Sequence, residues 1–95
     1  MPVVLIEHRV HDFEAFKAAY LDDADRRRRF GSLGGRVYAA ADDPGVVFVL
    51  LEWDSEDRAR DFALSLELHQ AAEWSARGVS TPRVLVLDRA LDSAV

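Results

Sequence analysis

The stretch VVFVLLEW at residues 46–53 decides the fold of this chain. Its first six residues are all apolar, and most are β-branched or aromatic, which is typical of a buried strand. A strand of an antiparallel sheet with one face in water would instead alternate apolar and polar side chains. We therefore expect both faces of this strand to be covered, and the rest of the sequence must supply the covers.

Strand and helix patterns alternate around this stretch. VVLIEHRV at 3–10 predicts a first strand, and Asp12 then occupies the N-cap position of a helix. Phe13, Phe16 and Tyr20 follow helical spacing and give this helix one apolar face. Aspartates precede arginines by four residues further along, which favours a single long, exposed helix that ends at Gly31.

The second half of the chain repeats the alternation. Turn residues at 42–45 join two strands into a hairpin, and Asp54 or Ser55 caps a second helix. The predicted elements are a loop at 32–35, strands at 36–41 and 46–53, a helix that breaks near Ser65 and resumes over 67–77, and a last strand at 83–89.

The predicted order is β-α-β-β-α-β, which is the α+β, ferredoxin-like plan with an antiparallel four-stranded sheet. Residues 1–89 form one domain in this interpretation, and 90–95 form a frayed tail. Both helices cover one face of the sheet, and a chain of 95 residues has no further element for the other face. We expect a second copy to cover it, which closes a homodimeric α+β barrel.

Composition excludes several classes of function. The chain has 12 Lys and Arg against 17 Asp and Glu, a net charge of −5, which argues against nucleic acid or an anionic membrane as a partner. It has no cysteine, which excludes disulfides, thiolate catalysis and cysteine-based metal sites. The N-terminal apolar run is too short for a signal peptide or a membrane span, so we expect a cytoplasmic protein.

With this pattern, residues 3–88 resemble the dimeric α+β barrel superfamily, in particular its small antibiotic-biosynthesis-monooxygenase-like and polyketide-cyclase-like members. The motifs that carry the resemblance are Glu7-His8-Arg9-Val10 with Asp12-Phe13 and Phe16-Lys17, then Gly34-Gly35-Arg36, Asp42-Asp43-Pro44 and Leu51-Glu52-Trp53-Asp54. Relatives include cofactor-free oxygenases, haem-degrading enzymes, cyclases and proteins without known activity. The resemblance therefore predicts the fold far more sharply than the chemistry.

The resemblance also bears on cofactors. Haem-degrading members use an Asn, a Trp and a His ligand, at positions that fall here on His8, Phe62 and Ala72, and this chain contains no Asn at all. His69 lies one turn before Ala72, and Glu73 follows it at i+4, but two ligands are too few for a metal site. We expect no haem, no metal and no other cofactor.

Strand parity assembles a candidate site. Val4, Ile6, His8 and Val10 share one face of the first strand, which we assign to the helices. If 42–45 is a four-residue hairpin loop, Tyr38 pairs with Val49, and Arg36 and Tyr38 share the helix face with Trp53. His8, Tyr38 and Trp53 then line one pocket between the sheet and the helices.

Each candidate residue has a chemical role and a structural alternative. His8 titrates near neutral pH and is the candidate general base, and Tyr38 is the candidate donor to a developing oxyanion. Trp53 and Phe62 are candidates to stack on a flat ligand, with Arg36 and His69 as further substrate-binding residues. In the alternative interpretation, His8 is a core histidine and Tyr38 only fills space.

Two functions remain open at this point. The first is a dimer that binds a small aromatic or polyketide-like molecule and catalyses cofactor-free oxygenation or ring closure. The second is a non-catalytic, ligand-binding or stress-related dimer of the same fold. A cavity of about 300 Å³ or more beside His8 would favour the first.

Overall fold

The computed structural model describes residues 1–66 and 82–95, and it is built on one antiparallel sheet of four strands in the order β2-β3-β1-β4. The strands are β1 (Val3–Arg9), β2 (Ser32–Ala39), β3 (Val46–Trp53) and β4 (Arg83–Leu87). The two central strands are the apolar runs that decided the prediction, because a strand in the middle of a covered sheet is buried on both sides. Val4 lies opposite Leu51, and Ile6 lies opposite Val49.

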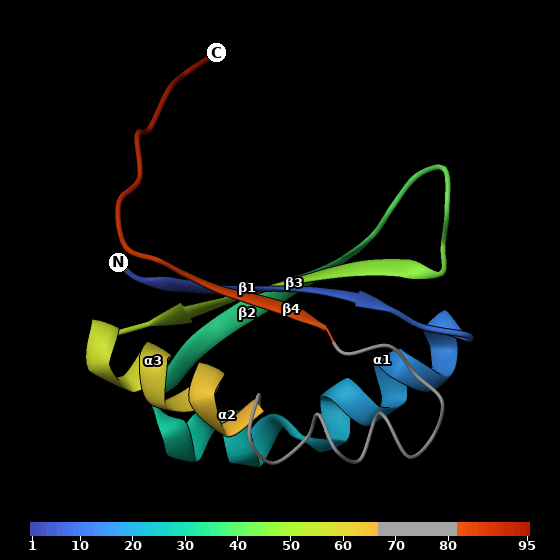
Figure 1. Ribbon diagram of the computed structural model, residues 1–95, viewed down its shortest axis with the longest axis horizontal. Helices are drawn as coiled ribbons and strands as arrows, with labels where there is room; N and C mark the ends of the chain where they lie inside the picture. The colour runs from blue at the N-terminus through green and yellow to red at the C-terminus, as the bar shows by residue number, and fades with distance from the viewer. Residues whose placement is uncertain (67–81) are drawn as a thin grey trace.

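Three helices lie together on one face of this sheet (Figure 1). They are α1 (Phe13–Asp22), α2 (Ala24–Phe30) and α3 (Glu56–Ser65). The expected ferredoxin-like α+β fold is confirmed, with α1 and α2 together in the place of its first helix. The predicted second half of the last helix, over 67–77, lies outside the described residues.

The caps at the helix ends agree with the sequence. The carboxylate of Asp12 accepts a hydrogen bond from the backbone N–H of Glu14, and the hydroxyl of Ser55 accepts one from the backbone N–H of Arg58. At the end of α2, Gly31 adopts the left-handed conformation with φ of 105°, which favours glycine. These local signals therefore placed the helix ends correctly.

The prediction of one long first helix is wrong, because the helix breaks at Asp23. Asp23 has φ −88° and ψ 9°, and its backbone N–H closes α1 by donating to Ala19 and Leu21. The ion pairs were predicted between residues four positions apart, but they form between residues three positions apart: Asp23 with Arg26 at 3.6 Å, and Asp25 with Arg28 at 2.5 Å. The break turns α2 so that the Arg26 guanidinium reaches the Ser65 hydroxyl on α3.

Strand β2 begins four residues earlier than predicted, at Ser32, where a loop was expected. The register shifts between Ser32 and Gly34, which marks a β-bulge. The Ser32 hydroxyl lies 3.3 Å from the Glu52 carbonyl oxygen of β3, so a side chain ties the bulged segment to the sheet. At the other end of the sheet, β4 stops at Leu87, and residues 88–95 extend from it without regular structure.

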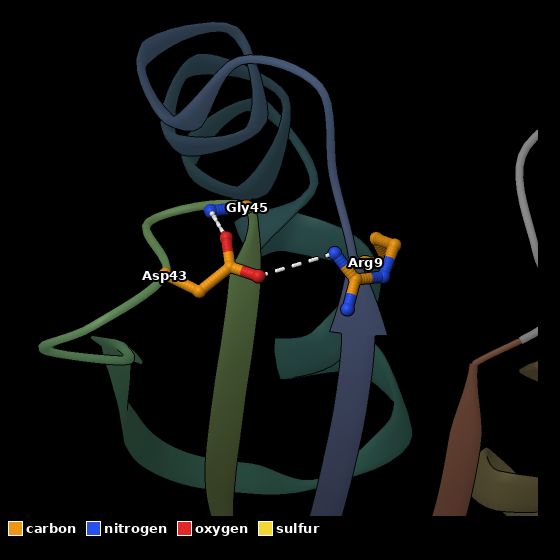
Figure 2. A network of polar contacts seen from close by, with 3 residues as sticks. All are labelled: Arg9, Asp43 and Gly45. Carbon is orange, nitrogen blue, oxygen red and sulfur yellow. Dashed lines mark hydrogen bonds and ion pairs between the residues drawn. The ribbon is translucent and has the colours of Figure 1, made fainter.

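The predicted hairpin register is wrong by one residue. The Ala40 N–H donates to the Val46 carbonyl at 2.9 Å, so the loop comprises residues 41–45 and includes Ala41. Asp43 holds this longer loop in place: one carboxylate oxygen accepts from the Gly45 N–H at 2.9 Å, and the other is 3.2 Å from the Arg9 guanidinium (Figure 2). Tyr38 consequently pairs with Phe48 rather than Val49, and every side chain of β2 changes face.

The two faces of the sheet have very different surroundings. Toward the helices, alternate side chains of β1 and β3 are buried and form the core with α3. The opposite face carries a second apolar set, half-buried or exposed, that no described element covers; its members are Val3, Leu5, Val46, Phe48, Leu50, Leu85 and Leu87. Within residues 1–66 and 82–95, the two central strands are therefore covered on the helix side only. Among the described residues, no helix is long and apolar enough to cross a membrane.

Candidate ligand-binding cavity

A cavity of about 440 Å³ lies between the helix face of the sheet and the helices. Strands β1 and β3 supply its mostly apolar floor, and α1, α2 and α3 supply its walls. The side chains that line it from the sheet are Ile6, His8, Val49 and Leu51, and those from the helical side include Phe16, Ala19, Tyr20, Asp22, Asp23, Arg27, Phe62 and Leu66.

His8 is the buried polar residue of this cavity. It is 8 % exposed, and its ring meets Phe16 edge to face with the ring centroids 6.2 Å apart. Burial disfavours the charged imidazolium, so the pKa of His8 is lowered from its ordinary value of 6.5. At neutral pH the ring is therefore uncharged, which is the state in which a histidine accepts a proton.

Tyr20 and Arg27 form a stacked pair at the helical end of the cavity. The guanidinium carbon of Arg27 lies 3.7 Å from the centroid of the Tyr20 ring, within the range of a cation–π interaction. The Phe16 ring stacks beside the Tyr20 ring, with the two ring centroids 6.2 Å apart. The cavity thus has an apolar interior and an uncharged histidine, and its lining also includes the Arg27 guanidinium and the side chains of Asp22 and Asp23.

Trp53 and Phe62 lie where the sequence predicted, on the helix face, but they differ in role. Their ring centroids are 5.0 Å apart, and both rings are almost fully buried. Phe62 lines the cavity, whereas Trp53 is absent from the described residues that line it. Trp53 therefore packs behind the cavity wall and supports Phe62 rather than facing a ligand directly.

Tyr38 and Arg36 lie on the opposite face of the sheet from His8, so the expected His8–Tyr38 pocket does not form. The physical reason is the extra loop residue at position 41, which moves Tyr38 next to Phe48. The Arg36 guanidinium donates a long hydrogen bond of 3.4 Å to the Tyr38 hydroxyl, and this bond raises the pKa of Arg36. Both side chains border a second hollow of about 380 Å³ on the uncovered face.

A comparison with known proteins supports the fold. No family model matches the chain, and no curated protein matches its sequence. The chain does match solved structures: a proposed antibiotic biosynthesis monooxygenase from Deinococcus radiodurans has a TM-score of 0.73 and 13 % identity, over 100 % of this chain and 98 % of that one. A proposed antibiotic biosynthesis monooxygenase from Bordetella bronchiseptica has a TM-score of 0.72 and 16 % identity, over 95 % and 97 % of the two chains.

A third structure, named as an antibiotic biosynthesis monooxygenase, has a TM-score of 0.63 and 12 % identity, over 96 % of this chain and 100 % of that one. The chain therefore shares the ferredoxin-like α+β fold of these solved structures. The resemblance inferred from the sequence is thus confirmed at the level of the fold. At these identities the matches do not transfer any residue's role, so the chemistry of the site rests on this chain's own side chains.

Sequence reasoning missed two residues of this cavity, Tyr20 and Arg27. Tyr20 was assigned only to the apolar face of the first helix, and the arginines that follow it were assigned only to an exposed part of that helix. Helical spacing could have found Tyr20, which follows Phe16 at i+4, whereas Arg27 lies on α2 beyond the break at Asp23, so the spacing from Phe16 and Tyr20 does not reach it. His69 lies outside the described residues, and the described part of the chain holds no cluster of potential metal ligands.

Proposed function

We propose that this protein is a homodimeric barrel that binds a small, flat aromatic or polyketide-like molecule in the cavity between its sheet and its helices. The observation that carries the proposal is the cavity of about 440 Å³, which is mostly apolar and has the uncharged His8 in its wall. Small-molecule sites have volumes of about 300–1,000 Å³ and combine apolar walls with a few polar groups. The cavity fits this description in size and in chemistry.

The proposed catalytic role of His8 is to accept the proton of a phenolic or enolic hydroxyl group. The O–H bond breaks, its electron pair stays on the ligand oxygen as a phenolate or enolate, and the proton forms an N–H bond on the imidazole. An electron-rich anion of this kind is the species that reacts further in cofactor-free oxygenation or ring closure. The names of two similar structures, proposed antibiotic biosynthesis monooxygenases, agree with oxygenation.

The dimer in this proposal is closed through the uncovered face of the sheet. Leu5, Phe48 and Leu50 lie at the centre of that face and are half-buried in the single chain. Contiguous exposed apolar patches of folded proteins mark interaction sites. A second copy presents the same apolar face, so a two-fold contact covers both faces at once.

One observation favours the binding-only alternative. Tyr38, the expected oxyanion donor, is on the other face of the sheet, so His8 acts in the cavity without that hydroxyl. A protein of this fold that binds an aromatic ligand without turning it over needs the apolar cavity alone. The two functions differ in whether the bound ligand is consumed.

Binding of 2-naphthol, measured by isothermal titration calorimetry, tests the proposal. We expect the wild type to bind it with a stoichiometry of one per chain, and His8→Phe to weaken binding at least tenfold while the fold is preserved. The matched control is His11→Phe, which makes the same chemical change at an exposed histidine outside the cavity. Oxygen consumption with the bound phenol separates the enzyme from the binding protein, and absence of saturable binding would overturn both.

A further inference from the structure

Two hollows on the helical side of the sheet share a wall. The main cavity and a smaller groove of about 230 Å³ have exactly two lining residues in common among the described residues, Tyr20 and Arg27. On its far side the groove is lined by Ala24 and Arg28 of α2 and by Ser32, Leu33, Gly34 and Gly35 of β2. The groove therefore continues the cavity toward the edge strand of the sheet, beyond the Tyr20–Arg27 pair.

Tyr20 spans the space between α1 and β2. A Cβ atom built on Gly35 would lie 3.2 Å from the Tyr20 hydroxyl, so the phenol end of the ring rests against the bare backbone of the edge strand. The Arg27 guanidinium covers the ring at 3.7 Å, and Phe16 stacks beside it. The ring is thus held at its helix end, at its face and at its tip.

We infer that Tyr20 is the specificity-determining residue of the cavity, because it forms the partition that sets the length of ligand that the cavity accepts. This inference rests on the proposed function and adds the residue that selects among flat ligands. With the ring in place, a rigid ligand is confined to the cavity beside His8. With a smaller side chain at position 20, the cavity and the groove become one elongated site that ends on the glycine backbone of β2.

The ligand class that reports on such a partition is a rigid, linear, fused-ring phenol. Its hydroxyl end is anchored near His8 and its rings extend toward Tyr20, so the number of rings measures the free length of the site. Flexible ligands fold back within a cavity of this volume and are less informative. The series 2-naphthol, 2-hydroxyanthracene and 2-hydroxytetracene has two, three and four rings.

The experiment compares dissociation constants of this series for the wild type, Tyr20→Ala, Tyr20→Leu and Tyr20→Phe by calorimetry. We expect Tyr20→Ala and Tyr20→Leu to improve the affinity for the four-ring phenol relative to the two-ring phenol at least tenfold, which is about 1.4 kcal/mol. Tyr20→Phe keeps the ring and retains the wild-type ratio. Lys17→Ala, an exposed change on the same helix, is the matched control and leaves the ratio unchanged.

A second measurement locates the far end of the ligand. Because the chain has no cysteine, Leu33→Cys places a single thiol in the groove, where Leu33 is 56 % exposed. We expect the four-ring phenol to slow the alkylation of this thiol by iodoacetamide when Tyr20→Leu is also present. With Tyr20 retained, the phenol should not change the rate of alkylation. Leu64→Cys, at a site of similar exposure on α3, is the control, and the phenol should not change its alkylation rate either with Tyr20 or with Tyr20→Leu.

The outcomes separate the inference from the proposed function. If the wild type binds the two-ring phenol but no folded variant at position 20 changes the length preference or the thiol protection, the partition is wrong and the cavity proposal stands. If the wild type binds none of the three phenols, the proposed function falls and this inference falls with it.

Discussion

Replacing Leu50 with lysine places a charge at the centre of the uncovered sheet face. Leu50 pairs with Leu5 on β1 and with Arg36 on β2, and Leu85 extends the same row beyond Leu5. The side chain is half-buried in the single chain and points away from the helices. Leu50→Lys therefore leaves the core of the protomer intact and changes the proposed dimer contact.

The size of the effect follows from what covers the face. In a free protomer the lysine ammonium reaches water from a half-buried position, and the cost to folding is about 1 kcal/mol or less. In a closed dimer, each of the two ammonium groups loses its hydration, which costs several kcal/mol per charge, and each protomer also loses the burial of a leucine. We expect the dimer dissociation constant to rise at least a hundredfold, or about 3 kcal/mol.

Sedimentation equilibrium over a range of micromolar concentrations measures this constant, and circular dichroism checks that the variant is folded. Leu21→Lys is the matched control, because Leu21 lies on α1 and is already 60 % exposed. It introduces the same charge on the helical side and should leave the dimer unchanged. A well-folded wild-type monomer at micromolar concentration would refute the reasoning, as would a Leu50→Lys variant with the wild-type dissociation constant.

Three further predictions concern stability. Burial lowers the pKa of His8, so below pH 6.5 the unfolded chain takes up a proton that the folded chain does not bind. The free energy of unfolding should therefore fall as the pH drops below that value. Urea denaturation across this range should show a weaker pH dependence of the unfolding free energy for His8→Phe than for the wild type. Phe62→Ala removes a ring that is 2 % exposed and packs against Trp53, and should lower the free energy of unfolding by about 3–5 kcal/mol; a loss below about 1 kcal/mol would contradict the assigned packing. Asp43→Ala removes an exposed ion pair with Arg9 and a part-buried hydrogen bond from the Gly45 N–H, so the free energy of unfolding should fall by about 1 kcal/mol and amide exchange at Gly45 should accelerate. An unchanged exchange rate would count against the role of Asp43 in holding the loop.

The sequence predicted the fold because several independent local signals agreed. The apolar run over 46–51 requires a central strand, and Asp12, Ser55 and Gly31 each mark a helix end by a hydrogen bond or a backbone conformation that few other residues provide. These features depend on near neighbours in the chain, so they can be interpreted without knowledge of the tertiary structure.

The candidate site was harder to predict because it depends on a single residue of register. Including Ala41 in the hairpin loop moves Tyr38 to the opposite face, and what stabilises the longer loop is a contact from Arg9, 34 positions away in the sequence. The break at Asp23, which brings Arg27 to the cavity, is likewise accompanied by long-range packing of Arg26 on α3. His8 and Phe62 were placed correctly because strand parity and helical spacing alone determine their face.

The most direct test of the central claim is the imidazole nitrogen spectrum of His8 during a titration with 2-naphthol. Nuclear magnetic resonance of the ¹⁵N-labelled protein resolves the ring nitrogens of individual histidines, and His8 is identified by its loss in His8→Phe. We predict that the His8 resonances shift saturably, with the dissociation constant measured by calorimetry, while those of His11 stay in place. Saturable binding of 2-naphthol with unshifted His8 resonances would place the ligand elsewhere and contradict the account.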